Sequence, residues 1–332
     1  MRIVQTTGAL KGWKAGEASI EEMAGKLRDA GYRGVDISFT GAMQKKDAVS
    51  RSLSLPDWRD RMKETREKLL KMDMPAVQSH APFFNMLSPD LEGLDERMEM
   101  VNRSVEASGI LGIPWVVMHP GTDYGDNRFR VNLKKNIEFF KPVLETAASF
   151  HTGIAIENLF DTFHYPQGVA GSSEKTDRRG NHRLIPMRRF GANPEELMEL
   201  VDALSSEFPN VGICWDFGHA NEAGLDHVKA LKLLGRRIKV LHVNDNLTVY
   251  DDHMTPFAGS VPWEQVFVCL KQIGYEGNFT YENIKFYSRL PEGLLDAALR
   301  YGREVAEYLV GVYEMAEREQ QETSLSDSFL QE

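Results

Sequence analysis

Residues 211–220 have the sequence VGICWDFGHA, in which an apolar run ends at a carboxylate, Asp216. An apolar run of this length is typical of a strand that is buried on both faces, as the strands of parallel sheets are. Parallel sheets need a long connection after each strand, and that connection is usually a helix. The stretch therefore predicts one βα unit, with Asp216 at the carboxyl end of its strand.

The same unit recurs along the chain. Short apolar runs alternate with amphipathic segments, and eight such pairs are present, with predicted strands at Ile3–Thr7, Gly34–Phe39, Ala76–His80, Trp115–His119, Gly153–Glu157, Val211–Asp216, Lys239–Val243 and Asn278–Glu282. Among the helices between them, Ser19 with Glu22 forms a predicted capping box, and Asn193 caps a helix that begins at Pro194. TTGALKGW, after the first strand, matches no Gly-rich phosphate loop of a doubly wound nucleotide fold. The sequence thus predicts an α/β protein, a single (β/α)8 TIM barrel.

Two regions depart from the repeat. The stretch from Asp161 to Ala192 is an insertion after the fifth strand, and its glycines (Gly168, Gly171 and Gly180) fit either a lid over the barrel mouth or a passive surface loop. The chain becomes polar and loses its periodicity from about Glu317. We therefore predict a barrel over residues 1–316 and a disordered tail over residues 317–332.

The composition limits the classes of partner. The chain has 332 residues, 42% hydrophobic and 27% charged, and no apolar run of the roughly 18 residues that a membrane span needs. The first residues do not resemble a secretory signal, so we expect a cytoplasmic protein without a membrane partner. Cys214 and Cys269 are expected to be buried thiols. A net charge of −10 makes nucleic acid an unlikely partner. A homo-oligomer is compatible with the sequence.

Ionisable side chains gather at the predicted strand ends and in the loops just after them. They are His80, His119, Glu157, Asp216, His219, His242, Asp251, His253 and Glu282. Each alone is more simply a hydrogen-bonded structural residue. Together they would place several carboxylates at one barrel mouth, which costs several kcal/mol unless they are paired, protonated or bound to metal. The pattern predicts a divalent metal site, and its nitrogen and oxygen ligands suit Mn, Zn, Co or Fe.

These motifs make the chain resemble the xylose isomerase-like superfamily of barrels, which includes sugar epimerases similar to tagatose 3-epimerase and the repair enzyme endonuclease IV. In the epimerase branch a single metal is bound after strands five to eight by Glu, Asp, His and Glu, and this order is matched by Glu157, Asp216, His242 and Glu282. The resemblance implies that Glu157 and Glu282 also serve as base and acid in proton transfer through an enediolate. It further implies that His219, three residues after Asp216, contacts a substrate oxygen.

Other residues of the predicted mouth are expected to contact the substrate, namely His80, His119, His253 and Arg189. The aromatic candidates for packing against a sugar face are Phe83, Phe84, Phe257 and Trp263, although ordinary packing is favoured for Trp263 because it begins a helix. The epimerases also use an Arg just past the strand-seven His, and HVNDNLTVYDDH has none. Arg188 and Arg189, in the insertion, either replace it or are solvated charges.

Endonuclease IV provides an alternative. Its three-zinc site uses nine residues, and all nine ionisable residues named above fall in the corresponding motifs. The acidic balance of the chain argues against this phosphodiesterase reading. A metal-binding barrel without turnover is disfavoured because both paired glutamates are present. We therefore expect a sugar isomerase or epimerase that acts on a ketose or a related small sugar or polyol with Mn, Co or Zn.

Overall fold

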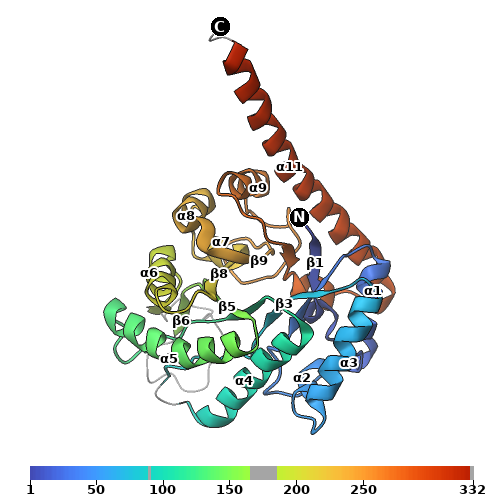
Figure 1. The fold of residues 1–332 in the computed structure, drawn as a ribbon, viewed down its shortest axis with the longest axis vertical. Helices are drawn as coiled ribbons and strands as arrows, with labels where there is room; N and C mark the ends of the chain where they lie inside the picture. Colours follow the sequence, from blue (N-terminus) through green and yellow to red (C-terminus); the bar gives the residue numbers. More distant parts are fainter. Residues whose placement is uncertain (89–90, 165–184, 330–332) are drawn as a thin grey trace, which may run out of the picture.

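Eight parallel strands form one sheet in the order β10-β1-β2-β3-β4-β5-β8-β9. The computed structural model describes residues 1–88, 91–164 and 185–329. The strands are β1 (Ile3–Thr6), β2 (Val35–Ser38), β3 (Ala76–His80), β4 (Trp115–Met118), β5 (Gly153–Glu157), β8 (Val211–Asp216), β9 (Ile238–His242) and β10 (Phe279–Tyr281). Two backbone hydrogen bonds join the ends of the sheet, from Val243 N to Thr280 O (2.8 Å) and from Glu282 N to Val243 O (3.1 Å). The sheet thus closes into the predicted (β/α)8 barrel (Figure 1).

Each predicted strand overlaps an observed one, and the differences lie at the ends. β4 ends at Met118 and β10 at Tyr281, so His119 and Glu282 lie one residue beyond their strands. At these points the backbone leaves the ladder toward the mouth of the barrel. The side chains of His119 and Glu282 are therefore carried by the first residue of a loop.

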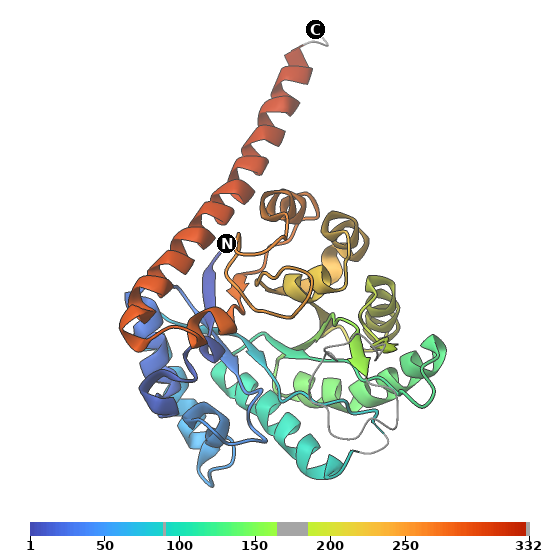
Figure 2. The same cartoon turned by 180° about the vertical axis from the view of Figure 1, so that it is seen from behind.

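Helices surround the barrel (Figure 2). They are α1 (Ile20–Asp29), α2 (Ala48–Ser52), α3 (Trp58–Lys71), α4 (Leu94–Leu111), α5 (Phe129–Ser149), α6 (Pro194–Ser205), α7 (Phe217–Glu222), α8 (His227–Leu234), α9 (Trp263–Gln272), α10 (Ile284–Ser288) and α11 (Leu295–Phe329). Both predicted caps are confirmed. Ser19 and Glu22 make the two reciprocal bonds of a capping box, and the Asn193 side chain accepts from Glu195 N. Apolar side chains such as Met23 and Leu27 are fully buried, which fixes α1 against the body of the barrel.

A small apolar cluster comprises Val117, Ala155, Cys214 and Val240, one from each of β4, β5, β8 and β9. Successive side chains of a strand alternate between its faces, so residues two positions further along point to the same side. Those residues are His119, Glu157, Asp216 and His242. The ionisable groups therefore form the next layer toward the mouth, and Cys214 is the buried thiol that the sequence predicted.

The insertion begins and ends as a short antiparallel pair, β6 (Thr162–His164) with β7 (Ile185–Met187). The three glycines of the insertion fall within residues 165–184, which lie outside the described residues. The choice between a lid and a passive surface loop therefore stays open.

Helix α11 continues to Phe329, and Figure 1 shows it projecting beyond the barrel. The backbone of residues 317–329 is helical, whereas the sequence predicts a disordered tail over residues 317–332. Glu, Arg and Gln, which favour helix, are frequent in this segment. The division of the chain at residue 316 stays a prediction. None of the described helices has the length and apolar character needed to cross a membrane.

Candidate metal centre at the barrel mouth

Four of the predicted ligands meet at the carboxyl ends of β5, β8, β9 and β10. We call them the inner cluster: Glu157, Asp216, His242 and Glu282. One ligand atom from each lies within 4.8 Å of the others, and all four residues are buried. Asp216 and His242 are in register on neighbouring strands, so adjacent strand ends bring them together. The structure therefore assembles the four residues as the sequence predicted.

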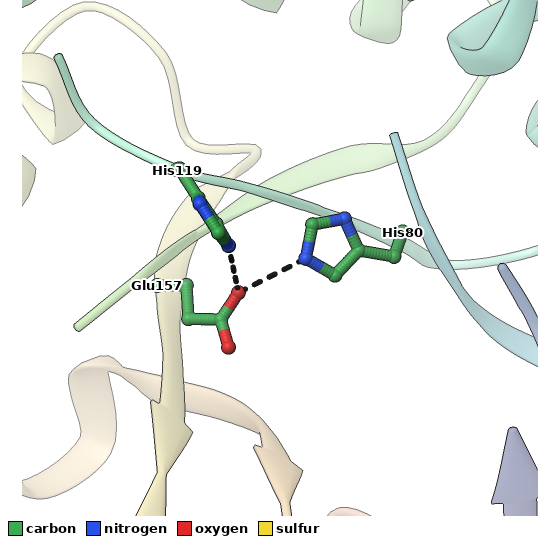
Figure 3. A group of neighbouring side chains, drawn as sticks. All are labelled: His80, His119 and Glu157. Carbon is green, nitrogen blue, oxygen red and sulfur yellow. Dashed lines mark hydrogen bonds and ion pairs between the residues drawn. The ribbon is translucent and has the colours of Figure 1, made fainter. Parts of the chain in front are cut away.

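Glu157 lies at the centre of the site. Its Oε2 lies 3.1 Å from His80 Nε2 and 2.9 Å from His119 Nε2, as Figure 3 shows, and its Oε1 lies 2.7 Å from His242 Nδ1. Glu282 Oε2 approaches the same nitrogen of His242 at 3.2 Å. Asp216 Oδ2 lies 3.8 Å from this nitrogen as well, so one histidine nitrogen faces three carboxylates.

In this layer buried carboxylates lie against imidazole rings, and each group shifts the pKa of the other. Burial would raise the pKa of the Glu157 carboxyl, but His242 and His119 hold that pKa well below its usual value. Burial raises the pKa of Asp216 to about 7 and lowers the pKa of His119 to about 4. His119 is therefore neutral near pH 7, and an uncharged imidazole nitrogen is the form that binds metal.

Three histidines are fixed by backbone carbonyls. The Nδ1 groups of His80, His219 and His253 donate to the carbonyls of Ala81 (2.8 Å), Asn158 (2.8 Å) and Glu282 (2.7 Å). Each ring then turns its Nε2 toward a carboxylate, and in the neutral tautomer that nitrogen carries a lone pair. Either a proton or a metal ion on that nitrogen offsets the facing carboxylate, and metal-binding histidines are usually anchored in this way. The donor set therefore fits a divalent metal.

Asp216 is held by backbone and amide donors. Its Oδ1 accepts from His219 N (2.6 Å) and its Oδ2 from Asn244 Nδ2 (2.7 Å). A Cβ atom added at Gly218 would lie 1.8 Å from Asn244 Oδ1. The glycine of the WDFGHA motif thus leaves room for the amide that orients Asp216.

A second group, the outer cluster, consists of His219, Asp251 and His253. Asp251 Oδ2 lies 2.7 Å from His253 Nε2 and 3.9 Å from His219 Nε2. Burial would lower the pKa of His253, but the hydrogen bond to Asp251 raises it to about 10, and the pKa of Asp251 is correspondingly lowered. In the absence of metal the outer cluster is an ion pair.

Glu157 and Glu282 of the inner cluster, with all three residues of the outer cluster, line a cavity of about 290 Å³, a size that suits a small molecule. Its apolar wall includes Phe83 and Phe160, and Arg189 also lines it. A hollow of about 340 Å³ outside the barrel, between α6 and α8, contains neither cluster.

Other predicted contacts lie away from the cavity. Arg188 pairs with Glu196 at 2.8 Å. Phe84 packs against Arg97, and Phe257 packs against Tyr308. Trp263 is buried at the start of α9, where it donates to Asp245. Of the basic and aromatic residues expected at the mouth, Arg189 and Phe83 therefore line the cavity.

Phe160 and Lys285 also line the cavity, and neither was predicted from the sequence. Phe160 follows Glu157 by three residues, and Lys285 follows Glu282 by three, the same spacing that separates His219 from Asp216. This repeated spacing of three residues could have pointed to both residues.

A family model, the xylose isomerase-like TIM barrel, matches residues 24–305, which is most of the chain. The chain belongs to the xylose isomerase-like TIM barrel family. An uncharacterized protein of Methanocaldococcus jannaschii is 29% identical to this chain over 213 residues, and the match covers 61% of this chain and 63% of that protein. A probable endonuclease 4 of Acholeplasma laidlawii is 27% identical over 185 residues, covering 53% and 54%. The chain thus spans less than two thirds of the length of these relatives.

Solved structures share the xylose isomerase-like barrel. A D-tagatose 3-epimerase-like protein superposes with a TM-score of 0.65 at 21% identity, covering 95% of this chain and 99% of that one. An IolI protein with a bound zinc atom superposes with a TM-score of 0.69 at 17% identity, covering 94% and 99%. At these identities the likeness shows the fold alone.

Proposed function

We propose that this protein is a divalent-metal-dependent sugar isomerase or epimerase that acts on a ketose or a related small sugar. The observation that carries the proposal is the inner cluster, in which Glu157 and Glu282 both approach His242 Nδ1 at the base of a small cavity. The sugar epimerases among the structural neighbours support the same reading.

The reaction requires removal of a proton from the carbon beside a carbonyl, which leaves negative charge on the carbonyl oxygen. Mn, Co or Zn held by Glu157, Asp216, His242 and Glu282 would supply Lewis acidity that stabilises this charge. The layer below the ligands is apolar and the ligands themselves are buried. Such a site excludes water and strengthens the interactions that stabilise an enediolate.

Glu157 and Glu282 are the proposed base and acid. They come from strands separated by β8 and β9, so they reach the cavity from different sides of the barrel. One carboxylate removes the proton and the other returns it, which inverts the carbon or moves the carbonyl. The lowered pKa of Glu157 keeps this group ionised near pH 7, which is the form that accepts a proton.

His219 and Phe160 shape the substrate side. The Phe160 ring lies 4.9 Å from the His219 ring between centroids, and the His219 Nδ1 bond to Asn158 O fixes that imidazole. His219 Nε2 is then available to a substrate oxygen, and Phe83 and Phe160 offer apolar surface to the carbon face of a sugar.

A screen of ketoses for epimerisation and isomerisation tests the proposal. Glu157→Gln and Glu282→Gln should each lower kcat by on the order of 10²- to 10⁴-fold, since each removes a proton-transfer group. Glu199→Gln is the matched control, because Glu199 forms an exposed ion pair with Arg130. Unchanged turnover in either cavity variant would contradict the assignment.

A second candidate is a phosphodiesterase similar to endonuclease IV. The observation that favours it is that three ligand groups adjoin one another: His80 with His119 and Glu157, the inner cluster, and the outer cluster. Several metals placed in this way would clamp a phosphodiester and activate water. Incision of DNA that contains an abasic site, together with more than one zinc per chain, would favour this function over sugar chemistry.

A further inference from the structure

Arg189 lines the cavity, and its guanidinium has no ion-pair partner among the residues that the structure describes. Its guanidinium carbon lies 5.3 Å from the centroid of the Phe160 ring, and its backbone N donates to Asp161. Over the described parts of the chain, the guanidinium itself has no hydrogen bond or ion pair. Burial lowers the pKa of Arg189, although the nearby carboxylates of Glu157, Asp251 and Glu222 oppose this effect. Burial of a cation without an ion-pair partner costs free energy, and an anionic ligand can supply the missing partner.

Lys285 places a second cation on the same cavity. It belongs to α10, which follows β10, and its ammonium group contacts the backbone carbonyl of Asp251. Within the described residues no carboxylate forms an ion pair with it. The charge of Lys285 acts on the Asp251 carboxylate and helps to lower the pKa of that group, but it forms no ion pair with it.

The nearby carboxylates do not neutralise these cations, because they already have partners. Asp251 is paired with His253 at 2.7 Å, and Glu157 contacts three histidines. The neighbouring Arg188 shows the contrast, since its guanidinium pairs with Glu196 at 2.8 Å. The two adjacent arginines thus differ, because Arg188 has an ion-pair partner in the protein whereas Arg189 faces the cavity.

We propose that the substrate carries an oxyanion, a phosphate or a carboxylate, which binds to Arg189 and Lys285 while its sugar carbons face the inner cluster. The inference rests on the proposed function and narrows the substrate class from neutral ketoses to sugar phosphates or sugar acids. Stacking on Phe160 holds the planar guanidinium in place, which favours bidentate binding of an oxyanion.

Equilibrium binding by calorimetry tests this inference without relying on turnover. The manganese-loaded protein is titrated with a ketohexose, with its phosphate ester and with a keto-hexonate. The readout is the ratio of the Kd of the neutral sugar to that of each charged ligand. We expect a ratio of about ten or more for at least one charged ligand, as a charge-assisted hydrogen bond provides. The phosphate and carboxylate arms identify which oxyanion the site accepts.

Variants separate recognition from packing. Arg189→Gln should reduce the ratio about tenfold and Lys285→Gln should reduce it less, while Arg188→Gln should leave it at the wild-type value. A merely structural effect of Arg189→Gln would weaken neutral and charged ligands alike and leave the ratio unchanged, and that result would overturn the inference. A wild-type ratio near one would also overturn it.

The two proposals fail in different ways. Turnover of neutral ketoses with a ratio near one would remove the oxyanion site and leave the isomerase in place. A ratio that depends on Arg189 without turnover of any sugar, charged or neutral, would support the oxyanion site and contradict the isomerase.

Discussion

The inner and outer clusters use the same residue types but differ in charge. The inner cluster has three carboxylates and one histidine, whereas the outer cluster has one carboxylate and two histidines. Asp251 is satisfied by the protonated ring of His253, and the two form an ion pair at 2.7 Å. No single proton can satisfy Glu157, Asp216 and Glu282 together, because mutual repulsion among buried carboxylates remains.

This difference in charge indicates which cluster requires a metal ion. A divalent cation removes the repulsion of the inner cluster, and a proton is sufficient for the outer one. The outer cluster therefore decides between the two candidate functions. If it remains an ion pair, the set of three ligand groups that the phosphodiesterase uses is incomplete, and the site suits sugar chemistry. If it binds metal, the site is multinuclear and suits a phosphodiester.

The largest effect is expected from Glu157→Gln. The carboxylate contacts His80, His119 and His242, so its loss weakens every metal position that it shares. Metal affinity should fall by about 100-fold or more and kcat by on the order of 10³-fold. Metal analysis after dialysis and steady-state kinetics measure both. Retention of metal at the wild-type level would refute the central role of Glu157.

Removal of metal by a chelator should destabilise the wild-type protein. At a free metal concentration of about 100 times Kd the bound ion contributes about 2.7 kcal/mol, which corresponds to a few degrees in Tm. Differential scanning calorimetry with and without chelator measures the shift. Glu157→Gln is the control, since the chelator should have little effect on its Tm. An equal shift in both proteins would place the stabilising metal elsewhere.

A smaller effect is expected from Asp251→Asn. This change removes the ion pair of the outer cluster but leaves the inner ligands in place, so metal content should be unchanged and kcat should fall by about tenfold at most. Loss of metal from Asp251→Asn would show that the outer cluster binds an ion and would favour the phosphodiesterase.

The smallest effect concerns pH in the metal-free protein. The pKa of His253 is raised from an ordinary value of about 6.5 to about 10. Its contribution to stability is therefore fully present below pH 6.5 and is lost as pH rises toward 10. Tm should decline over this window in the wild type, and less steeply in His253→Gln.

His227→Gln is the control for the pH series. Burial lowers the pKa of His227 to about 4, so this residue affects stability only as pH falls below about 6.5. The slope above pH 6.5 should therefore match that of the wild type. An unchanged slope in His253→Gln would show that the ion pair does not contribute.

Much of the site was predictable because its residues end apolar strands. A carboxylate after IAI or GICW is conspicuous, and period-two alternation together with βα order places such residues in one layer. The contacts of Glu157 with three histidines were not predictable, since they depend on the register of β3, β4 and β9 around the closed barrel. Phe160 lies in a loop and Lys285 in the short helix α10, so their three-residue spacing from Glu157 and Glu282 was the only sequence signal for them. The helical backbone beyond Glu317 was missed because the segment has helix-forming residues but no apolar face.

Metal content per chain, measured on protein purified without added metal, tests the central claim most directly. We expect about one Mn, Co or Zn per chain in the wild type and in Asp251→Asn, and almost none in Glu157→Gln. Two or three zinc ions per wild-type chain, with some lost in Asp251→Asn, would contradict it, because the outer cluster would then be a metal site rather than an ion pair.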